Sequence, residues 1–199
     1  MKYIFCTFVI SSAPKLLYYM NISLTRTFLL FLFIGLFSTG FSSKALKPNK
    51  KEKINWITLE EAAARTKKEP RKIIVDVYTD WCGWCKKMDQ STYSNAAIAD
   101  MVNKNFYAVK FDAESKEPIT INGKTFKYNA QYRAHEAAIA LLNGQMSYPS
   151  TVYLDEKFAI IAPVPGYLDV SALKDLLTYF GDNHYRKKTY QEYSAVKSK

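Results

Sequence analysis

A strand-like run that leads directly into two cysteines limits the fold of this chain more than any other feature. Residues 73–78 (Ile-Ile-Val-Asp-Val-Tyr) are mostly apolar and β-branched, as in a central strand covered on both faces. The run Asp-Trp-Cys-Gly-Trp-Cys-Lys-Lys-Met follows at 80–88 and can begin a helix. The partial positive charge at a helix N-terminus favours thiolate over thiol. The spacing therefore predicts Cys82 as an exposed nucleophilic thiol and Cys85 as a more buried thiol one turn further in.

Two other roles for this cysteine pair are weaker. A structural crosslink that closes a loop of about four residues restricts the unfolded chain by only about 2 kcal/mol. A structural metal site needs about four ligands. The chain has only two histidines, His135 and His184, and neither lies at ligand-like spacing from the cysteines. The pattern therefore favours disulfide exchange.

The N-terminal residues 1–45 have the composition of an export signal. They contain four bases and no acid, with a polar, positive start at 21–26 and an apolar run at 27–37. Eleven apolar residues are too few to span a bilayer, which takes about 20. Ser43-Lys44-Ala45 fits a cleavage site, so we expect a cleaved signal peptide and a mature protein in the periplasm or cell envelope. An uncleaved anchor is the weaker alternative, and Met20 is an alternative start.

The remaining chain is long enough for one good-sized core. We expect a linker at 46–53, one domain at 54–181 and a basic C-terminal tail at 182–199. The net charge of +10 comes partly from bases near the two ends of the chain. No basic-aromatic stripe or nucleic-acid motif accompanies them, so the ends are interpreted as solvated and no nucleic-acid partner is expected.

Capping and turn signals place the remaining elements. Thr58 and Glu61 form a capping box for a helix to Lys68, and Asn122-Gly123 suits the type I′ turn of a hairpin at 119–128. Other helices are expected at 82–90, from Ser94 or Asn95 to Val102, from Asn129 to Leu142, and from Asp169 to Gly181. Other strands are expected at 106–111, 150–154 and 159–164. His135 would lie on the surface of the third of these helices.

This order of elements predicts an α/β fold, a three-layer sandwich around a central mixed sheet. The last two strands are too close in sequence for a helical crossover, so they should pair antiparallel. The hairpin and helix at 119–143 form an insertion before the strand at 150–154. It either borders a substrate groove or only decorates a loop.

Residues 75–86 (Val-Asp-Val-Tyr-Thr-Asp-Trp-Cys-Gly-Trp-Cys-Lys) resemble the active-site strand and helix start of the thioredoxin superfamily. The resemblance is closer to exported bacterial thioredoxin-like proteins, a group related to the C-terminal domain of the transmembrane thiol-disulfide interchange protein. Tyr148-Pro149-Ser150 matches the place of the family's cis-proline, and Gly166 matches the glycine before its last helix. The resemblance covers residues 54–180.

The resemblance implies roles for four residues. Cys82 would attack a substrate disulfide and Cys85 would resolve the mixed disulfide. Asp76 matches the family's buried acid, whose raised pKa would let it take the proton from Cys85. The alternative for Asp76 is a strand-edge carboxylate paired with a lysine. Pro149 would be cis, beside backbone that pairs with substrate; the alternative is a trans proline that begins an edge strand.

Four flanking residues complete the candidate site. Trp81 would shield the sulfurs and offer an apolar contact surface, although packing alone is an alternative. Trp84 stands where typical thioredoxins have proline, which leaves the redox potential open. Tyr148 stands where smaller residues are usual, so substrate preference does not carry over. Lys86 adds positive charge that favours thiolate.

These features predict a thiol-disulfide oxidoreductase that reduces disulfides of exported proteins. We expect a monomer without bound cofactor or metal, with a membrane thiol-disulfide transporter as electron donor. A disulfide oxidase or isomerase is an alternative in the same class. A non-catalytic thioredoxin-like chaperone or adaptor, and a metallochaperone, are alternatives from other classes.

Overall fold

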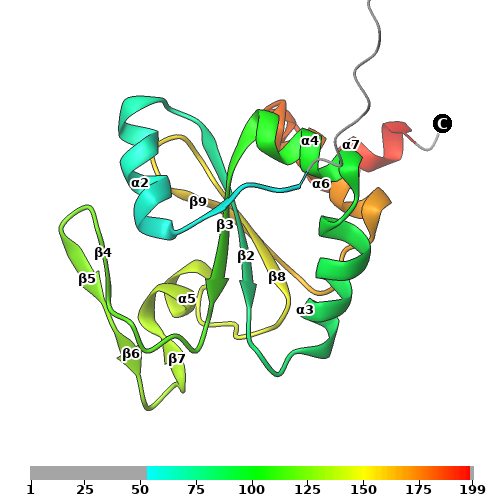
Figure 1. Ribbon diagram of the computed structural model, residues 1–199. Helices are drawn as coiled ribbons and strands as arrows, with labels where there is room; N and C mark the ends of the chain where they lie inside the picture. Colours follow the sequence, from blue (N-terminus) through cyan, green and yellow to red (C-terminus); the bar gives the residue numbers. More distant parts are fainter. Residues whose placement is uncertain (1–52, 198–199) are drawn as a thin grey trace, which may run out of the picture. The chain divides into compact units, whose positions relative to one another are not determined.

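A five-stranded sheet organises residues 53–197, the part of the chain that the computed structural model describes (Figure 1). Its strand order is β1-β3-β2-β8-β9. The strands are β1 (Trp56–Ile57), β2 (Lys72–Tyr78), β3 (Phe106–Asp112), β8 (Ser150–Leu154) and β9 (Ile160–Pro165). β1, β2 and β3 run parallel, whereas β8 pairs antiparallel with both β2 and β9. The expected mixed sheet and its antiparallel final pair are confirmed.

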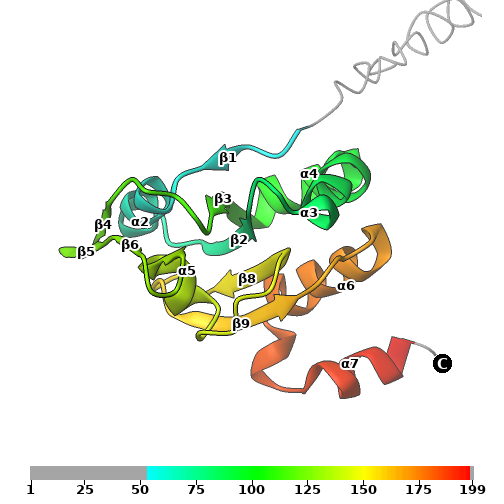
Figure 2. The ribbon, with the colours of Figure 1, turned by 90° about the horizontal axis from the view of Figure 1, so that it is seen from below.

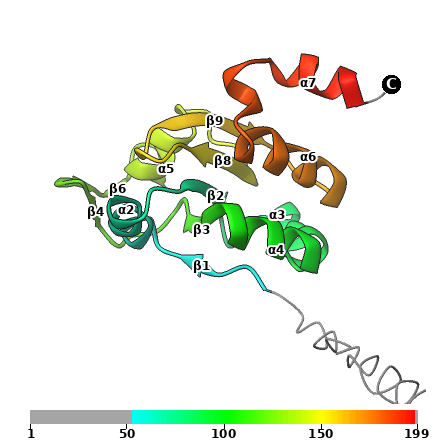
Figure 3. The same ribbon diagram turned by 90° about the horizontal axis from the view of Figure 1, so that it is seen from above.

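Helices cover both faces of this sheet (Figures 2 and 3). α2 (Leu59–Lys68) and α5 (Glu136–Leu141) lie on one face. α3 (Gly83–Met88), α4 (Ala96–Asn105) and α6 (Val170–Gly181) lie on the other. Alternation along β2 explains the two cores, because Val75 packs with residues of α2 and α5 whereas Ile74 packs with residues of α4 and α6. The three-layer sandwich expected from the sequence is confirmed.

Two of the local signals act as expected. The Thr58 hydroxyl accepts a hydrogen bond from the Glu61 backbone N–H at 3.1 Å, although the Glu61 carboxylate pairs with Arg65. The hairpin of β4 (Ile119–Ile121) and β5 (Lys124–Phe126) turns at Asn122-Gly123, with φ values of 51° and 82°. Positive φ at both central residues is the requirement of a type I′ turn.

Asn129 does not begin a helix, which corrects the expectation for residues 129–142. Its side-chain oxygen accepts hydrogen bonds from the backbone N–H groups of Gln131 and Tyr132, and this closes a turn instead. The turn joins a second small hairpin, β6 (Tyr128–Asn129) and β7 (Ala134–His135). α5 begins only at Glu136, with His135 as its N-cap residue.

The helix that contains the cysteines also differs from the expectation. α3 ends at Met88, and a π-helical segment, η1 (Asp89–Tyr93), follows it directly. Asn95, rather than Ser94, caps α4, because its side-chain oxygen accepts from the backbone N–H groups of Ala97 and Ile98. The Ser94 hydroxyl instead donates to the carbonyl of Gln90.

The C-terminal residues 182–197 are folded, which corrects the expectation of a solvated basic tail. They form a 3₁₀ turn, η2 (His184–Arg186), and a helix, α7 (Tyr190–Lys197). The rings of Tyr190 and Tyr193 lie 5.3 and 5.2 Å from that of Tyr179 on α6. The aromatic residues among the bases therefore attach this segment to the core.

The expected signal peptide at 1–45 and nearly all of the expected linker at 46–53 lie outside the described residues. Between residues 53 and 197, no helix has the length and apolar character needed to cross a membrane.

Candidate active site

The loops after β2, β3 and β9 and the loop before β8 meet at one end of the sheet, where the strands begin or end. β2 ends here, and Val77 pairs with Ser150 at the start of β8. Ser150 in turn pairs with Pro165 at the end of β9. The Gly166 N–H donates to the Pro149 carbonyl at 2.8 Å, and the φ of +96° at Gly166 is a value that favours glycine. The Ala113 N–H, just after β3, donates to the Tyr78 carbonyl.

Cys82 and Cys85 form a disulfide at this end of the sheet. Cys82 is the N-cap residue of α3, and its sulfur accepts a hydrogen bond from the Cys85 backbone N–H at 3.1 Å. Both cysteines are 4% exposed, which corrects the expectation that Cys82 would be the more exposed one. Gly83 and Trp84 between them are exposed.

Asp76 is buried in the central strand β2, with 2% of its surface exposed. Lys110 on β3 is its partner in register, and the ammonium lies 2.9 Å from the Asp76 carboxylate. Burial raises the pKa of Asp76, although the charge of Lys110 and its hydrogen bond oppose this shift. Asp76 is thus both buried, as expected, and paired with a lysine, but it does not lie at the edge of the sheet.

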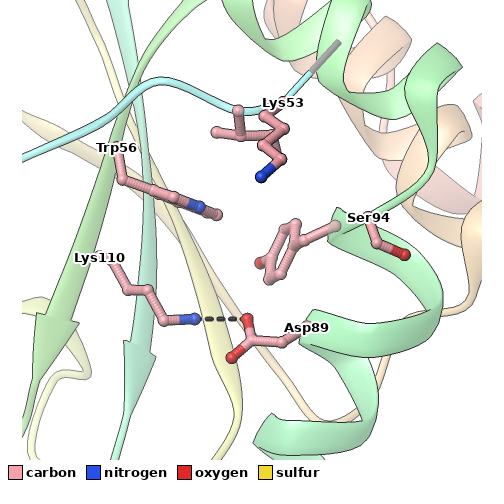
Figure 4. A pocket seen from close by; sticks show the side chains of 7 residues that line it. Lys53, Trp56, Asp89, Ser94 and Lys110 are labelled. Atoms are coloured by element: carbon pink, nitrogen blue, oxygen red, sulfur yellow. Dashed lines mark hydrogen bonds and ion pairs between the residues drawn. The ribbon is translucent and has the colours of Figure 1, made fainter. Parts of the chain in front are cut away.

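Lys110 also forms an ion pair with Asp89 of η1 (Figure 4). Burial disfavours the charged form of Lys110, but the carboxylates of Asp76 and Asp89 outweigh it and raise the pKa of the ammonium. The pair borders a cavity of about 450 Å³, which Trp56, Tyr93 and other residues line. Lys110 was not expected from the sequence, although a lysine within the mostly apolar strand β3 was a usable signal.

Tyr93 covers Asp76 from the helical side and was also missed. Its hydroxyl lies 3.4 Å from that of Thr151, which is the partner of Asp76 on β8. Burial raises the pKa of Tyr93, and the negative charge of Asp76 adds to this shift. Asp76 is therefore surrounded by groups from β3, β8 and η1.

Trp81 and Tyr148 form an aromatic pair beside the disulfide. Their rings meet edge to face at 5.9 Å, and Trp81 is 66% exposed. The indole N–H of Trp81 donates to Glu114 at 3.1 Å. Burial raises the pKa of Tyr148 to about 12, and the charges of Glu114 and Asp112 contribute to the shift. The peptide bond between Tyr148 and Pro149 is cis, as expected.

Trp84 belongs to a second aromatic pair, with Tyr167 after β9. The two rings lie 5.5 Å apart, and Trp84 is 57% exposed. The ammonium of Lys87 lies 4.6 Å from the ring centre of Trp84 and 5.3 Å from that of Tyr167. Lys86, the lysine expected to support the site, is exposed.

His135 is fully buried, which corrects the expectation of a surface residue. Its Nδ1 accepts a hydrogen bond from the Ala137 N–H at 3.1 Å, and its Nε2 lies 3.2 Å from the Glu117 carbonyl. These partners fit a neutral ring with its proton on Nε2. Burial lowers the pKa of His135. The buried ring therefore links the start of α5 to the segment that precedes β4.

The insertion contacts the rest of the molecule through α5, whose buried residues pack in the core with those of α2 and β2, and through its hairpin. The hairpin of β4 and β5 lies against α2, where the Thr120 N–H donates to the Glu60 carboxylate at 3.0 Å. Glu114, which precedes the hairpin, reaches Trp81. The residue that links this region to the cysteine site thus lies outside the 119–143 insertion.

Comparisons with known proteins agree with this architecture. Residues 39–163 match the family model Thioredox_DsbH, which is described as "Protein of unknown function, DUF255". A DsbH oxidoreductase structure is 17% identical, with a TM-score of 0.50 over 70% of this chain and 92% of that chain. A thioredoxin-fold protein from Helicobacter pylori gives the same identity and TM-score over 62% of this chain and 76% of that chain.

Two other matches cover part of this chain. The oxidised C-terminal domain of Neisseria meningitidis DsbD is 17% identical, with a TM-score of 0.41 over 62% of this chain and 90% of that chain. The uncharacterized protein B0495.5 of Caenorhabditis elegans is 26% identical over 102 residues, which are 51% of this chain but only 12% of that protein. The matched segment is thus a small part of a much longer relative. Since the family model covers more than half of the sequence and the fold agrees, this chain belongs to the Thioredox_DsbH family of the thioredoxin superfamily.

Proposed function

We propose that this protein is a thiol-disulfide oxidoreductase that reduces disulfides of exported proteins. The observation that carries the proposal is the Cys82–Cys85 disulfide at the start of α3. The buried Asp76 lies on the strand that leads to it, and cis-Pro149 lies on a neighbouring loop. In this proposal the working form is a monomer without a bound cofactor.

In the reduced protein, Cys82 attacks one sulfur of the substrate disulfide as a thiolate. The substrate S–S bond breaks, a mixed disulfide with Cys82 forms, and the released substrate thiolate takes up a proton. The Cys85 thiol then loses its proton and attacks the Cys82 sulfur, which releases the second substrate thiol. The substrate gains two electrons and two protons, and the protein ends in the oxidised form that the structure describes.

The surroundings of each sulfur support this division of work. The Cys85 N–H that donates to the Cys82 sulfur would stabilise a Cys82 thiolate in the same way. Asp76 would accept the proton of Cys85, because its raised pKa makes it a stronger base than an ordinary carboxylate. Lys86 adds positive charge near the thiolate.

Substrate would contact the exposed surface around the pair. Trp81 precedes Cys82 and Trp84 lies between the two cysteines, and both side chains are mostly exposed. Tyr148 and Pro149 provide the neighbouring loop, whose backbone would pair with an extended substrate segment. After each turnover a second dithiol must reduce the Cys82–Cys85 disulfide, and a membrane thiol-disulfide transporter would supply these electrons in the cell envelope.

Trapping tests the reaction directly. In Cys85→Ala the mixed disulfide on Cys82 cannot be resolved, so partners should remain attached and can be identified by mass spectrometry. The matched control is Cys82→Ala, which keeps one thiol but removes the nucleophile. Partners captured by Cys85→Ala but not by Cys82→Ala support the proposal, whereas equal capture or none would contradict it.

Two further measurements separate the alternatives. A reductase should be recovered mainly in the dithiol form from its native cells, whereas an oxidase should be recovered as the disulfide. A chaperone or adaptor should retain its cellular activity in the Cys82→Ser, Cys85→Ser double variant. Loss of activity in that variant excludes a function by binding alone.

A further inference from the structure

The two aromatic pairs lie on opposite sides of the disulfide. Tyr148 packs against the core on the face of α2 and α5, whereas Tyr167 packs against the core on the face of α3, α4 and α6. Glu114, the partner of Trp81, follows β3, and Tyr167 follows β9. β2 and β8, which carry the cysteine loop and Pro149, lie between these two strands in the sheet.

The charges beside the two pairs have opposite signs. The Trp81–Tyr148 pair has acids beside it: Glu114 accepts from the Trp81 indole, and the charges of Glu114 and Asp112 both act on Tyr148. The Trp84–Tyr167 pair has the ammonium of Lys87 over both rings. Asp169 also lies near Tyr167, but its carboxylate caps α6 by accepting from the Ala172 N–H at 2.8 Å.

The second aromatic pair is held in place by the π-helical segment. The Tyr167 hydroxyl lies 3.0 Å from that of Ser91, and the Thr92 hydroxyl donates to the Leu168 carbonyl at 2.8 Å. Both serine and threonine belong to η1, whose wider turn directly follows the cysteine helix. A surface fixed in this way can contact a partner without losing much conformational freedom.

From this arrangement we infer that the protein selects substrate cysteines with a basic residue on one side and an acidic residue on the other. The inference rests on the proposed thiol-disulfide exchange and names its substrate class. The basic residue would lie beside Glu114 at the Trp81–Tyr148 pair, and the acidic residue beside Lys87 at the Trp84–Tyr167 pair. Apolar or aromatic neighbours of the cysteine would contact the rings themselves.

The geometry of the sheet gives the spacing. β3 and β9 are three strand positions apart, or about 14 Å. An extended peptide rises about 3.4 Å per residue, so about four residues cover this distance. The charges should therefore lie about two residues before and two residues after the cysteine.

Short synthetic peptides test the inference. Each is a disulfide-linked homodimer with phenylalanine on both sides of its cysteine. One has lysine two residues before and glutamate two residues after the cysteine, the second has the reverse order, and the third has glutamine at both positions. Reduction of each peptide by the reduced protein is followed by quenched alkylation and mass spectrometry, with 2-hydroxyethyl disulfide as an uncharged small substrate.

The peptide with one charge order should be reduced about three- to ten-fold faster than the peptide with the other order at low salt. The difference between the two rates should shrink at high salt. Glu114→Gln, which keeps an oxygen to accept from Trp81, and Lys87→Gln should each reduce this preference, and the double variant should abolish it. The matched control Lys104→Gln removes an exposed charge from the last turn of α4 and should leave the preference unchanged.

Equal rates for the two orders, together with normal reduction of 2-hydroxyethyl disulfide, would overturn the inference and leave the proposed function intact. A preference that persists in the double variant would overturn it as well. If neither the peptides nor the small disulfide are reduced, the proposed function fails and the inference fails with it.

Discussion

Replacing Asp76 with asparagine should stabilise the oxidised protein near neutral pH. The carboxyl group is 2% exposed within β2, and burial raises its pKa despite the pairing with Lys110. Between the unfolded pKa of about 3.9 and the raised pKa of the folded state, the folded protein binds more protons than the unfolded chain. The free energy of unfolding of the parent protein therefore falls as pH rises through this window, and for one proton the slope approaches about 1.4 kcal/mol per pH unit.

Asparagine cannot titrate, so the variant should lack this slope. The substitution does not leave Lys110 unpaired, because Asp89 remains its partner. The difference in unfolding free energy should thus grow in favour of Asp76→Asn above about pH 4 and level off above the folded pKa of Asp76. The same variant should resolve mixed disulfides more slowly, by about 100-fold, because it lacks the base for Cys85.

Urea unfolding of the oxidised proteins between about pH 4 and pH 8 measures this difference. Asp100→Asn removes an exposed carboxylate from α4 and is the matched control, which should stay within about 0.5 kcal/mol of the parent. A variant that becomes less stable than the parent as pH rises would refute the reasoning. It would mean that the attraction to Lys110 outweighs the cost of burial.

Three further predictions concern the fold. The lowered pKa of His135 means that the native protein should lose stability as pH falls below about 6.5, because the unfolded chain then binds more protons. His135→Asn keeps an acceptor for the Ala137 N–H and should flatten this dependence in urea unfolding, whereas an unchanged slope would assign it to another group. Tyr153→Phe should raise the free energy of unfolding by about 1 kcal/mol, since the buried Tyr153 hydroxyl has no hydrogen-bond partner among residues 53–197. Tyr179→Phe is its control and should lower it by about 1 kcal/mol, because that hydroxyl donates to a carbonyl at 2.7 Å. Tyr193→Ala should cost about 2–3 kcal/mol in thermal or urea unfolding if the C-terminal helix is part of the core, and no loss would contradict that packing.

The fold was predictable where local signals and long-range packing agree. The mostly apolar, β-branched run 73–78 indicated a central strand, and the short connection between 154 and 159 indicated an antiparallel pair. Thr58 and Asp169 cap helices as their positions indicate. The superfamily also followed from residues 75–86 and Pro149 in this order, which the family match confirms.

The errors arose where one side chain has two competing uses. Asn129 can cap a helix or close a turn, and only pairing of Tyr128 with His135 decides for the turn. Burial of His135 depends on the Glu117 carbonyl, which lies 18 residues away in sequence. The C-terminal segment looked solvated because many of its residues are basic. The contact that attaches it to the core is made with Tyr179 on α6, which the local sequence does not reveal.

The positions of the two cysteines, Asp76 and Pro149 in the candidate site could be predicted from the sequence, whereas most of their charged and aromatic surroundings could not. Cys82, Cys85, Asp76 and Pro149 come from short patterns that a single sequence displays. Lys110, Asp89 and Tyr167 enter through strand register and the π-helical segment, which no local pattern reveals. The charged surroundings of the disulfide therefore arise only when the strands and η1 come together in the folded protein.

The central claim, that Cys82 and Cys85 form a redox-active pair, is tested most directly by the stoichiometry of reduction. The fully reduced protein is mixed with excess 2-hydroxyethyl disulfide without any other reductant, and the products are alkylated and weighed by mass spectrometry. The account predicts that each chain reduces one disulfide and ends with a Cys82–Cys85 bond, that Cys85→Ala stops at a mixed disulfide on Cys82, and that Cys82→Ala reacts far more slowly. Equal reaction of the two single variants, or a protein that keeps both thiols, would contradict it.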